Sequence, residues 1–300
     1  MARLAPLTIA EVDAAVRTWR SDLAADPGRS AVELRSQLRE LHDLLLRTTA
    51  VEVEPRETLD LVAGVIATIG VDAIDRLPTR PRIVFRLLYA ERVAAAWQVL
   101  LDNAAGVVDT GAFRRTLARS PLRLCVEAPA VFAQLPGFRD PRYDAPDSCY
   151  DVTDRTRLRA QLEEIEVDPA DGMVRFAGWA TVDLLGSSAD DSVRVLLADH
   201  GREVAVAAIR VRRSDRRAWA GWSAAVDVRD VTGIDVGRWG LSIEVDHEGV
   251  VGVADLGADS SDLARVTALD SVDVGDRAVR WDTSGSRWRL IVKDRRARGR

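Results

Sequence analysis

Few residues of this sequence have the types and spacing that catalysis or metal binding requires. Its three histidines are His42, His200 and His247, and none has a second ligand at the spacing of a metal site. The sequence has no Gly-x-Ser-x-Gly nucleophile elbow and no glycine-rich phosphate loop. It also lacks the Asp-x-Asp pair that would hold a metal against a nucleotide-sugar diphosphate. We therefore assign no catalytic residue, no metal site and no cofactor.

The remaining polar groups have structural interpretations. His42 falls on a leucine-rich helical stretch, whereas His200 and His247 fall in predicted hairpin turns. Asp246-His247-Glu248 could touch a cation, but a solvated turn is the favoured interpretation. The acidic run Glu163–Glu166 is predicted at a strand edge or a helix end, where water would solvate its carboxylates.

Tryptophan is the more informative residue type, because its ring can stack on a sugar ring or fill a core. Trp179 and Trp222 lie in phase with apolar neighbours on predicted strands, which favours the core. Trp219 lies beside Arg216 and Arg217, whose guanidinium groups could bind hydroxyls or phosphates. These three residues are the predicted ligand-binding group. In the alternative, Trp219 packs against the edge of the domain and the two arginines are solvated.

Composition bounds the class of protein. The 300 residues are 47% hydrophobic and carry a net charge of −5, so we expect real cores and no binding of nucleic acid. No apolar run is long enough to span a bilayer, and the first residues do not resemble a secretory signal. Cys125 and Cys149 are too few for a disulfide framework. We expect a cytoplasmic protein without a transmembrane segment, which a partner could hold at the inner face of the membrane.

Residues 1–120 predict a helical domain that packs as a small bundle. Leucines and valines recur at three- and four-residue spacing after Ser30, which with Glu33 forms a capping box. A second helix follows Pro55 and ends at Gly70, and a third helical stretch covers about 81–103. Five prolines within residues 121–149 then predict an extended surface connector.

After the connector the apolar period changes from three or four residues to two. Short alternating strands separated by turns that an Asp opens and a Gly closes predict hairpins. The fold class is therefore multidomain α + β, with the helical bundle followed by an antiparallel β-sandwich, Ig-like or jelly-roll-like, over 150–258. Residues 259–300 are predicted to add strands and a basic tail, in which Lys293 is the only lysine of the chain.

Three segments of the β half and one of the helical half carry a family resemblance. They are Tyr150-Asp-Val-Thr-Asp-Arg-Thr-Arg-Leu-Arg, Val174-Arg-Phe-Ala-Gly-Trp-Ala, Gly221-Trp-Ser-Ala-Ala-Val-Asp-Val-Arg and Arg76-Leu-Pro-Thr-Arg-Pro-Arg-Ile-Val-Phe-Arg-Leu-Leu. The first three resemble the C-terminal sandwiches of actinobacterial family 2 glycosyltransferases of the teichoic-acid type. The fourth resembles their helical linker. The resemblance covers about residues 35–295.

The resemblance implies an accessory region of cell-wall or cell-surface polysaccharide glycosyltransfer, used for binding or for oligomerisation. Members of the family carry an N-terminal catalytic domain with an Asp-x-Asp site, which this sequence lacks, so no catalytic residue is carried over. The implied partners are a cell-wall polysaccharide, a glycosyltransferase or further copies of the chain. Two alternatives stay open: a purely structural protein-interaction module, and a fragment of an intact glycosyltransferase.

Overall fold

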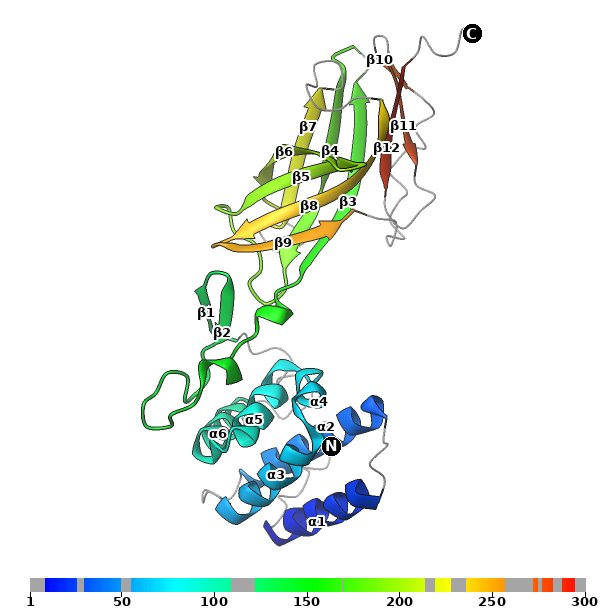
Figure 1. The fold of residues 1–300 in the computed structure, drawn as a ribbon. Helices are drawn as coiled ribbons and strands as arrows, with labels where there is room; N and C mark the ends of the chain where they lie inside the picture. The colour runs from blue at the N-terminus through cyan, green and yellow to red at the C-terminus, as the bar shows by residue number, and fades with distance from the viewer. Residues whose placement is uncertain are drawn as a thin grey trace. The chain divides into compact units, whose positions relative to one another are not determined.

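The protein has an α+β fold, seen in a computed structural model. Two compact units are present: one combines residues up to Cys125 with Val131–Val152, and the other combines Val126–Ala130 with Thr153–Arg300 (Figure 1). The structure describes residues 9–25, 30–49, 55–108, 122–168, 170–213, 219–227, 236–256, 272–274, 277–282 and 288–294.

The described part of the first unit contains six α-helices. They are α1 (Ile9–Ala25), α2 (Ala31–Thr48), α3 (Arg56–Ile69), α4 (Val71–Asp75), α5 (Thr79–Tyr89) and α6 (Val93–Val108). None of the helices in the described ranges is long and apolar enough to cross a membrane.

The local signals at the helix ends are confirmed. The Ser30 side chain accepts from the backbone of Glu33, and both halves of the capping box are present. Gly70 ends α3 with a φ of +86°, a conformation that an L side chain rarely adopts. The stretch predicted as one helix over 81–103 is instead two helices, α5 and α6. Glu91, with a φ of 58°, interrupts the helical backbone between them.

Most of the proline-rich segment, from Val131 on, belongs to the helical unit. It carries strand β2 (Ala130–Ala133) and the short helix η1 (Asp147–Cys149), and β1 (Leu124–Glu127) pairs with β2. Arg82 of α5 is fully buried, and its Nη2 donates to the carbonyl of Asp151 at 2.7 Å. Arg86 Nη1 donates to the carbonyl of Ser148 at 2.7 Å. Two arginines of α5 therefore fix this segment through its backbone oxygens.

The second unit is a large antiparallel sheet, preceded by η2 (Thr153–Arg155). Its strands are β3 (Leu158–Asp168), β4 (Met173–Val182), β5 (Ser192–Asp199), β6 (Arg202–Val211), β7 (Gly221–Asp227), β8 (Gly237–His247), β9 (Val250–Asp255), β10 (Val272–Val274), β11 (Arg277–Asp282) and β12 (Arg289–Asp294). Over the described residues their order is β10-β11-β12-β8-β5-β6-β7-β4-β3, and β9 pairs with β8.

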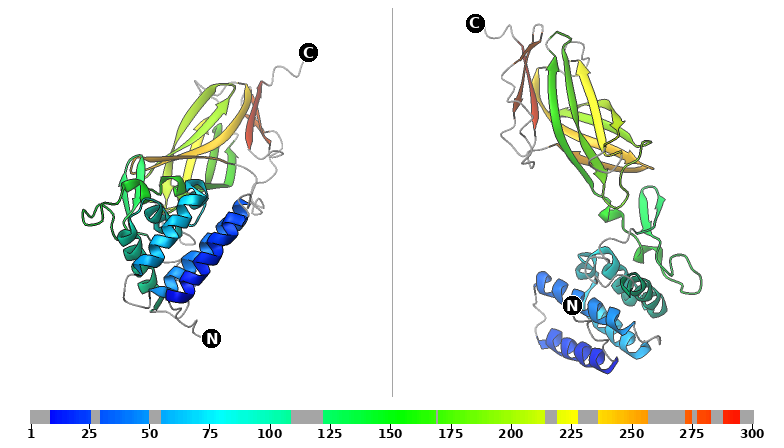
Figure 2. Two further views of the ribbon diagram at one scale, coloured as in Figure 1. Left: turned by 60° about the horizontal axis from the view of Figure 1, so that its bottom comes forward. Right: turned by 180° about the vertical axis from the view of Figure 1, so that it is seen from behind.

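The sheet curls so that its two halves face each other. Strands β5, β8 and β9 cross over β3, β4 and β7 when seen from either side (Figures 1 and 2). Between the halves lies one hydrophobic core, to which both contribute large side chains such as Phe176 and Trp222 on one half and Trp239 and Leu241 on the other. The predicted period of two is confirmed, because Val193, Val195 and Leu197 are all buried on β5.

The Asp-to-Gly turns are also confirmed where the structure describes them. Gly172, Gly201 and Gly249 close three of the predicted hairpins with φ values of +70°, +83° and +85°. The fourth predicted turn, which Asp282 opens, lies largely outside the described residues. Turn chemistry thus sets where this sheet reverses direction.

Candidate binding groove on the outer face of the sheet

The structure places one of the three predicted ligand-binding residues. Trp219 is half-buried in a turn two positions before β7 begins at Gly221. Arg216 and Arg217 lie outside the described residues. The grouping of Trp219 with the two arginines therefore stays a prediction.

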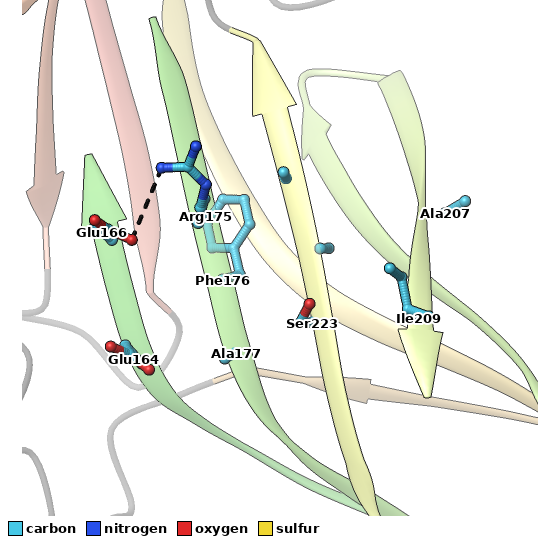
Figure 3. A pocket seen from close by; sticks show the side chains of 10 residues that line it. Glu164, Glu166, Arg175, Phe176, Ala177, Ala207, Ile209 and Ser223 are labelled. Atoms are coloured by element: carbon cyan, nitrogen blue, oxygen red, sulfur yellow. Dashed lines mark ion pairs between the residues drawn. The ribbon is translucent and has the colours of Figure 1, made fainter. Parts of the chain in front are cut away.

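A groove of about 490 Å³ is hollowed in the outer face of the sheet, where β6 and β7 separate (Figure 3). Residues Arg202–Ala208 of β6 pair with β5, and only Ile209–Val211 pair with β7. Strand β7 meanwhile continues along β4 as far as Asp227. The groove opens because β6 changes partners at this point and diverges from β7.

Cross-strand pairing arranges the groove residues in two rows. The first row, from β3 to β6, is Glu164, Ala177, Ser223 and Ile209; the second, from β3 to β7, is Glu166, Arg175 and Ala225. Small side chains form the floor of the groove, so a ligand can approach the sheet closely. Ile209 is 71% exposed and offers an apolar contact at one side of the groove.

The opposite side of the groove is acidic. Glu164 and Glu166 are exposed on β3, the strand at the end of the described order, as expected for carboxylates at a strand edge. Arg175 is the only cation in the groove lining that the structure describes. Its Nη1 lies 3.8 Å from carboxylate oxygens of both Glu166 and Asp168. The guanidinium is therefore shared between two carboxylates, and Glu164 adds a third to the same wall.

Trp179 stands in the next row of the same outer face. It pairs with Gln161 on β3 and with Gly221 on β7, and its indole Nε1 donates to Gln161 Oε1 at 2.9 Å. The prediction that Trp179 lies in the core is wrong, because the buried positions of β4 are those of Val174, Phe176 and the residues in phase with them. Apolar residues occur at both the odd and the even positions of β4, so the sequence of this strand does not show which face lies in the core. Trp222, in contrast, is confirmed in the core at 1% exposure.

A bulge adds two charged groups beside Trp179. The β3–β4 register shifts between Leu162 and Glu164, which makes Glu163 an extra residue. Its carboxylate pairs with Arg213, which follows β6. Arg213 lies over Gly221, since a Cβ on that glycine would stand 3.0 Å from Arg213 Cγ. The outer face thus combines a partly exposed indole, an amide and an ion pair next to the groove.

A second polar constellation lies inside the unit, at one end of the curled sheet. Asp191 Oδ2 accepts from Arg210 Nη2 at 2.6 Å, and Asp191 Oδ1 lies 2.6 Å from His247 Nδ1. Arg210 Nη1 also donates to the carbonyl of Ala180 at 2.9 Å. Burial lowers the pKa of the Arg210 guanidinium, and the charge of Asp191 opposes this effect. The group ties four segments of the chain together.

This constellation corrects the prediction for His247. The residue ends β8 and is only 8% exposed, so it does not lie in a solvated turn. His200 does lie in a solvated turn, with a side chain that is 93% exposed. Within the described ranges, no three His, Cys, Asp or Glu side chains are grouped as a metal site would require.

Comparison with known proteins gives one kind of match. No protein-family model matches the sequence. No curated protein matches it either. Among solved structures, the chain is similar to residues 217–571 of S. aureus TarS, with 11% identity, a TM-score of 0.44 and coverage of 95% of this chain and 76% of that one.

A second structure of S. aureus TarS gives 11% identity and a TM-score of 0.40 over 88% of this chain. The match covers 46% of that TarS chain, so the present chain spans about half its length.

Proposed function

We propose that this chain is an accessory region of cell-wall or cell-surface polysaccharide synthesis, and that its curled sheet binds carbohydrate in the groove at Ser223. The observation that carries the proposal is the composition of the groove. Small side chains let sugar rings lie flat along the groove, Ile209 can contact the apolar face of one ring, and Ser223 and Glu164 can bond hydroxyls of that ring and of its neighbour. The sequence motifs that resemble teichoic-acid glycosyltransferases supply the class of polymer.

The helical unit serves in this proposal as a spacer, and the chain works beside a glycosyltransferase or as part of one. We also propose that the chain divides into its functional parts after residues 120, 149 and 258, as expected from the sequence. In this proposal the first part is a helical bundle and the second is a β-sandwich. Oligomerisation through the outer face is the competing role for the sheet, because Val251 and Val253 of β9 are also more than half exposed.

The affinity for a single sugar should be low. A pyranose residue has about a dozen non-hydrogen atoms, and at about 0.3 kcal/mol for each atom its binding free energy is near −4 kcal/mol. This corresponds to a dissociation constant on the order of 1 mM. Oligosaccharides that extend along the groove should bind more tightly, so a glycan array with polymeric probes is the suitable first screen.

Filling the groove should abolish binding without unfolding the protein. Ala225 is exposed in the groove lining, so Ala225→Trp places a large ring in the groove and leaves the core unchanged. We expect calorimetric titration with the best oligosaccharide from the array to show at least a tenfold loss of affinity. Val251→Trp puts the same ring on the exposed face of β9 and is the control.

The control variant should bind as the wild type does, and both variants should keep the wild-type melting temperature. Equal affinities for the two variants would remove the groove as the binding site. No binding by the wild-type protein to any array glycan would instead favour the protein-interaction alternative.

A further inference from the structure

The charges of the groove point to a narrower class of ligand. We propose that the groove selects a saccharide that carries a protonated amine, held by Glu164; this inference rests on the carbohydrate binding proposed above. The groove wall at β3 and β4 holds the carboxylates of Glu164 and Glu166, with Asp168 next to them, against Arg175, the only cation of the groove lining that the structure describes. At neutral pH that wall carries two formal negative charges more than positive ones.

The three carboxylates of the wall differ in the hydrogen bonds and ion pairs that they make. Asp168 accepts from the backbone amides of Ala170 and Asp171, at 3.0 and 3.2 Å, and so stabilises its own turn. Glu166 shares Arg175 with Asp168. Glu164 makes none of these contacts, and its exposed carboxylate lies in the groove lining. A cationic group would therefore be bound at Glu164 without breaking an existing ion pair.

The geometry of the rows sets the size of the ligand. Glu164, Ala177, Ser223 and Ile209 lie on four adjacent strands in register. At about 4.8 Å between neighbouring strands, Glu164 and Ile209 are about 14 Å apart, which exceeds the width of one sugar ring. The ligand is accordingly a disaccharide or longer, with an amine near Glu164 and an apolar ring face on Ile209. An anionic polymer without amines would meet like charge at the acidic wall.

The experiment compares two probes that share one sugar backbone and differ at the amino group of each ring. A β-1,4-linked glucosamine tetrasaccharide carries free amines, and its N-acetylated counterpart carries none. Calorimetric titration at low salt should show at least fivefold tighter binding of the amine form to the wild-type protein. Glu164→Gln should remove that preference, so that the amine form and the acetylated form bind the variant with equal affinity. Glu248→Gln, in the turn between β8 and β9, is the matched control and should keep the preference.

The outcomes separate this inference from the function on which it rests. Equal binding of both probes at the groove overturns the amine preference and leaves carbohydrate binding intact. A preference that survives in Glu164→Gln also overturns it, because the selecting charge would lie elsewhere. Absence of binding for both probes and for every array glycan overturns both proposals. Tighter binding of a lysine-rich peptide than of either saccharide would show that the groove takes a protein partner, and would overturn both as well.

Discussion

Asp191→Asn should lower the free energy of unfolding of the β unit by about 3–5 kcal/mol, the cost of leaving one member of a buried ion pair uncompensated. The side chains of Arg210 and Asp191 are only 3% and 2% exposed, so water cannot solvate the guanidinium after the change. The same substitution also weakens the contact with His247 and the bond from the backbone amide of Ser188 to Asp191. Urea denaturation, monitored by tryptophan fluorescence, measures the loss of unfolding free energy.

A matched control comes from an exposed pair on the same sheet. Arg159 and Asp183 lie 2.8 Å apart, but their side chains are 68% and 30% exposed. Asp183→Asn should therefore change stability by at most about 1 kcal/mol. Combining Asp191→Asn with Arg210→Met should recover part of the loss, because no buried charge is then left alone. A loss for Asp191→Asn no larger than for Asp183→Asn would show that the pair does not stabilise the fold.

Gly178→Ala should destabilise the same unit by about 3 kcal/mol, since overpacking a tight site forces the backbone to move. A Cβ at Gly178 would lie 2.0 Å from the carbonyl oxygen of Gln161 and 3.0 Å from the buried ring of Trp222. The oxygen belongs to the neighbouring strand at its bulge, so β3 and β4 would have to separate. Thermal unfolding and the near-ultraviolet dichroism of the tryptophans would report the change.

The helical unit offers a control with the same substitution. Gly64 lies within α3, and a Cβ there would meet no atom within 4 Å. Gly64→Ala should stabilise the protein by about 0.5–1 kcal/mol, because alanine loses less conformational freedom than glycine when a helix forms. If both variants unfold at the wild-type temperature, the close approach of β3 and β4 at Gly178 is refuted.

Much of the local structure was predictable because its causes are short-range. The capping box at Ser30 and the stop at Gly70 depend on neighbouring backbone groups, and the Asp-to-Gly turns depend on residues a few positions apart. The alternation of Val193, Val195 and Leu197 likewise needs only the geometry of a single strand. Such signals indicate where elements begin, end and reverse.

The candidate groove was not predictable from the sequence, because it depends on pairing between distant strands. That Ile209 pairs with Ser223 while Ala208 pairs with Val193 follows from β6 changing partners, and no residue within β6 signals this change. Ser223 was visible as a serine beside Trp222, but its position between Ala177 and Ile209 required the register of three strands. The acidic run on β3 was predicted to face water, whereas its place in a groove was not.

The sequence by itself determined the two kinds of structure in this chain, the places where many of its elements start and stop, and the excess of acid that now lines one wall of the groove. Only the tertiary structure decided that Trp179 faces outward and that His247 is buried against Asp191. The physical reason is the range of the interactions involved. A cap or a turn is complete within a few residues, but the inner face of a strand and the partner of a buried charge exist only after distant segments have packed together.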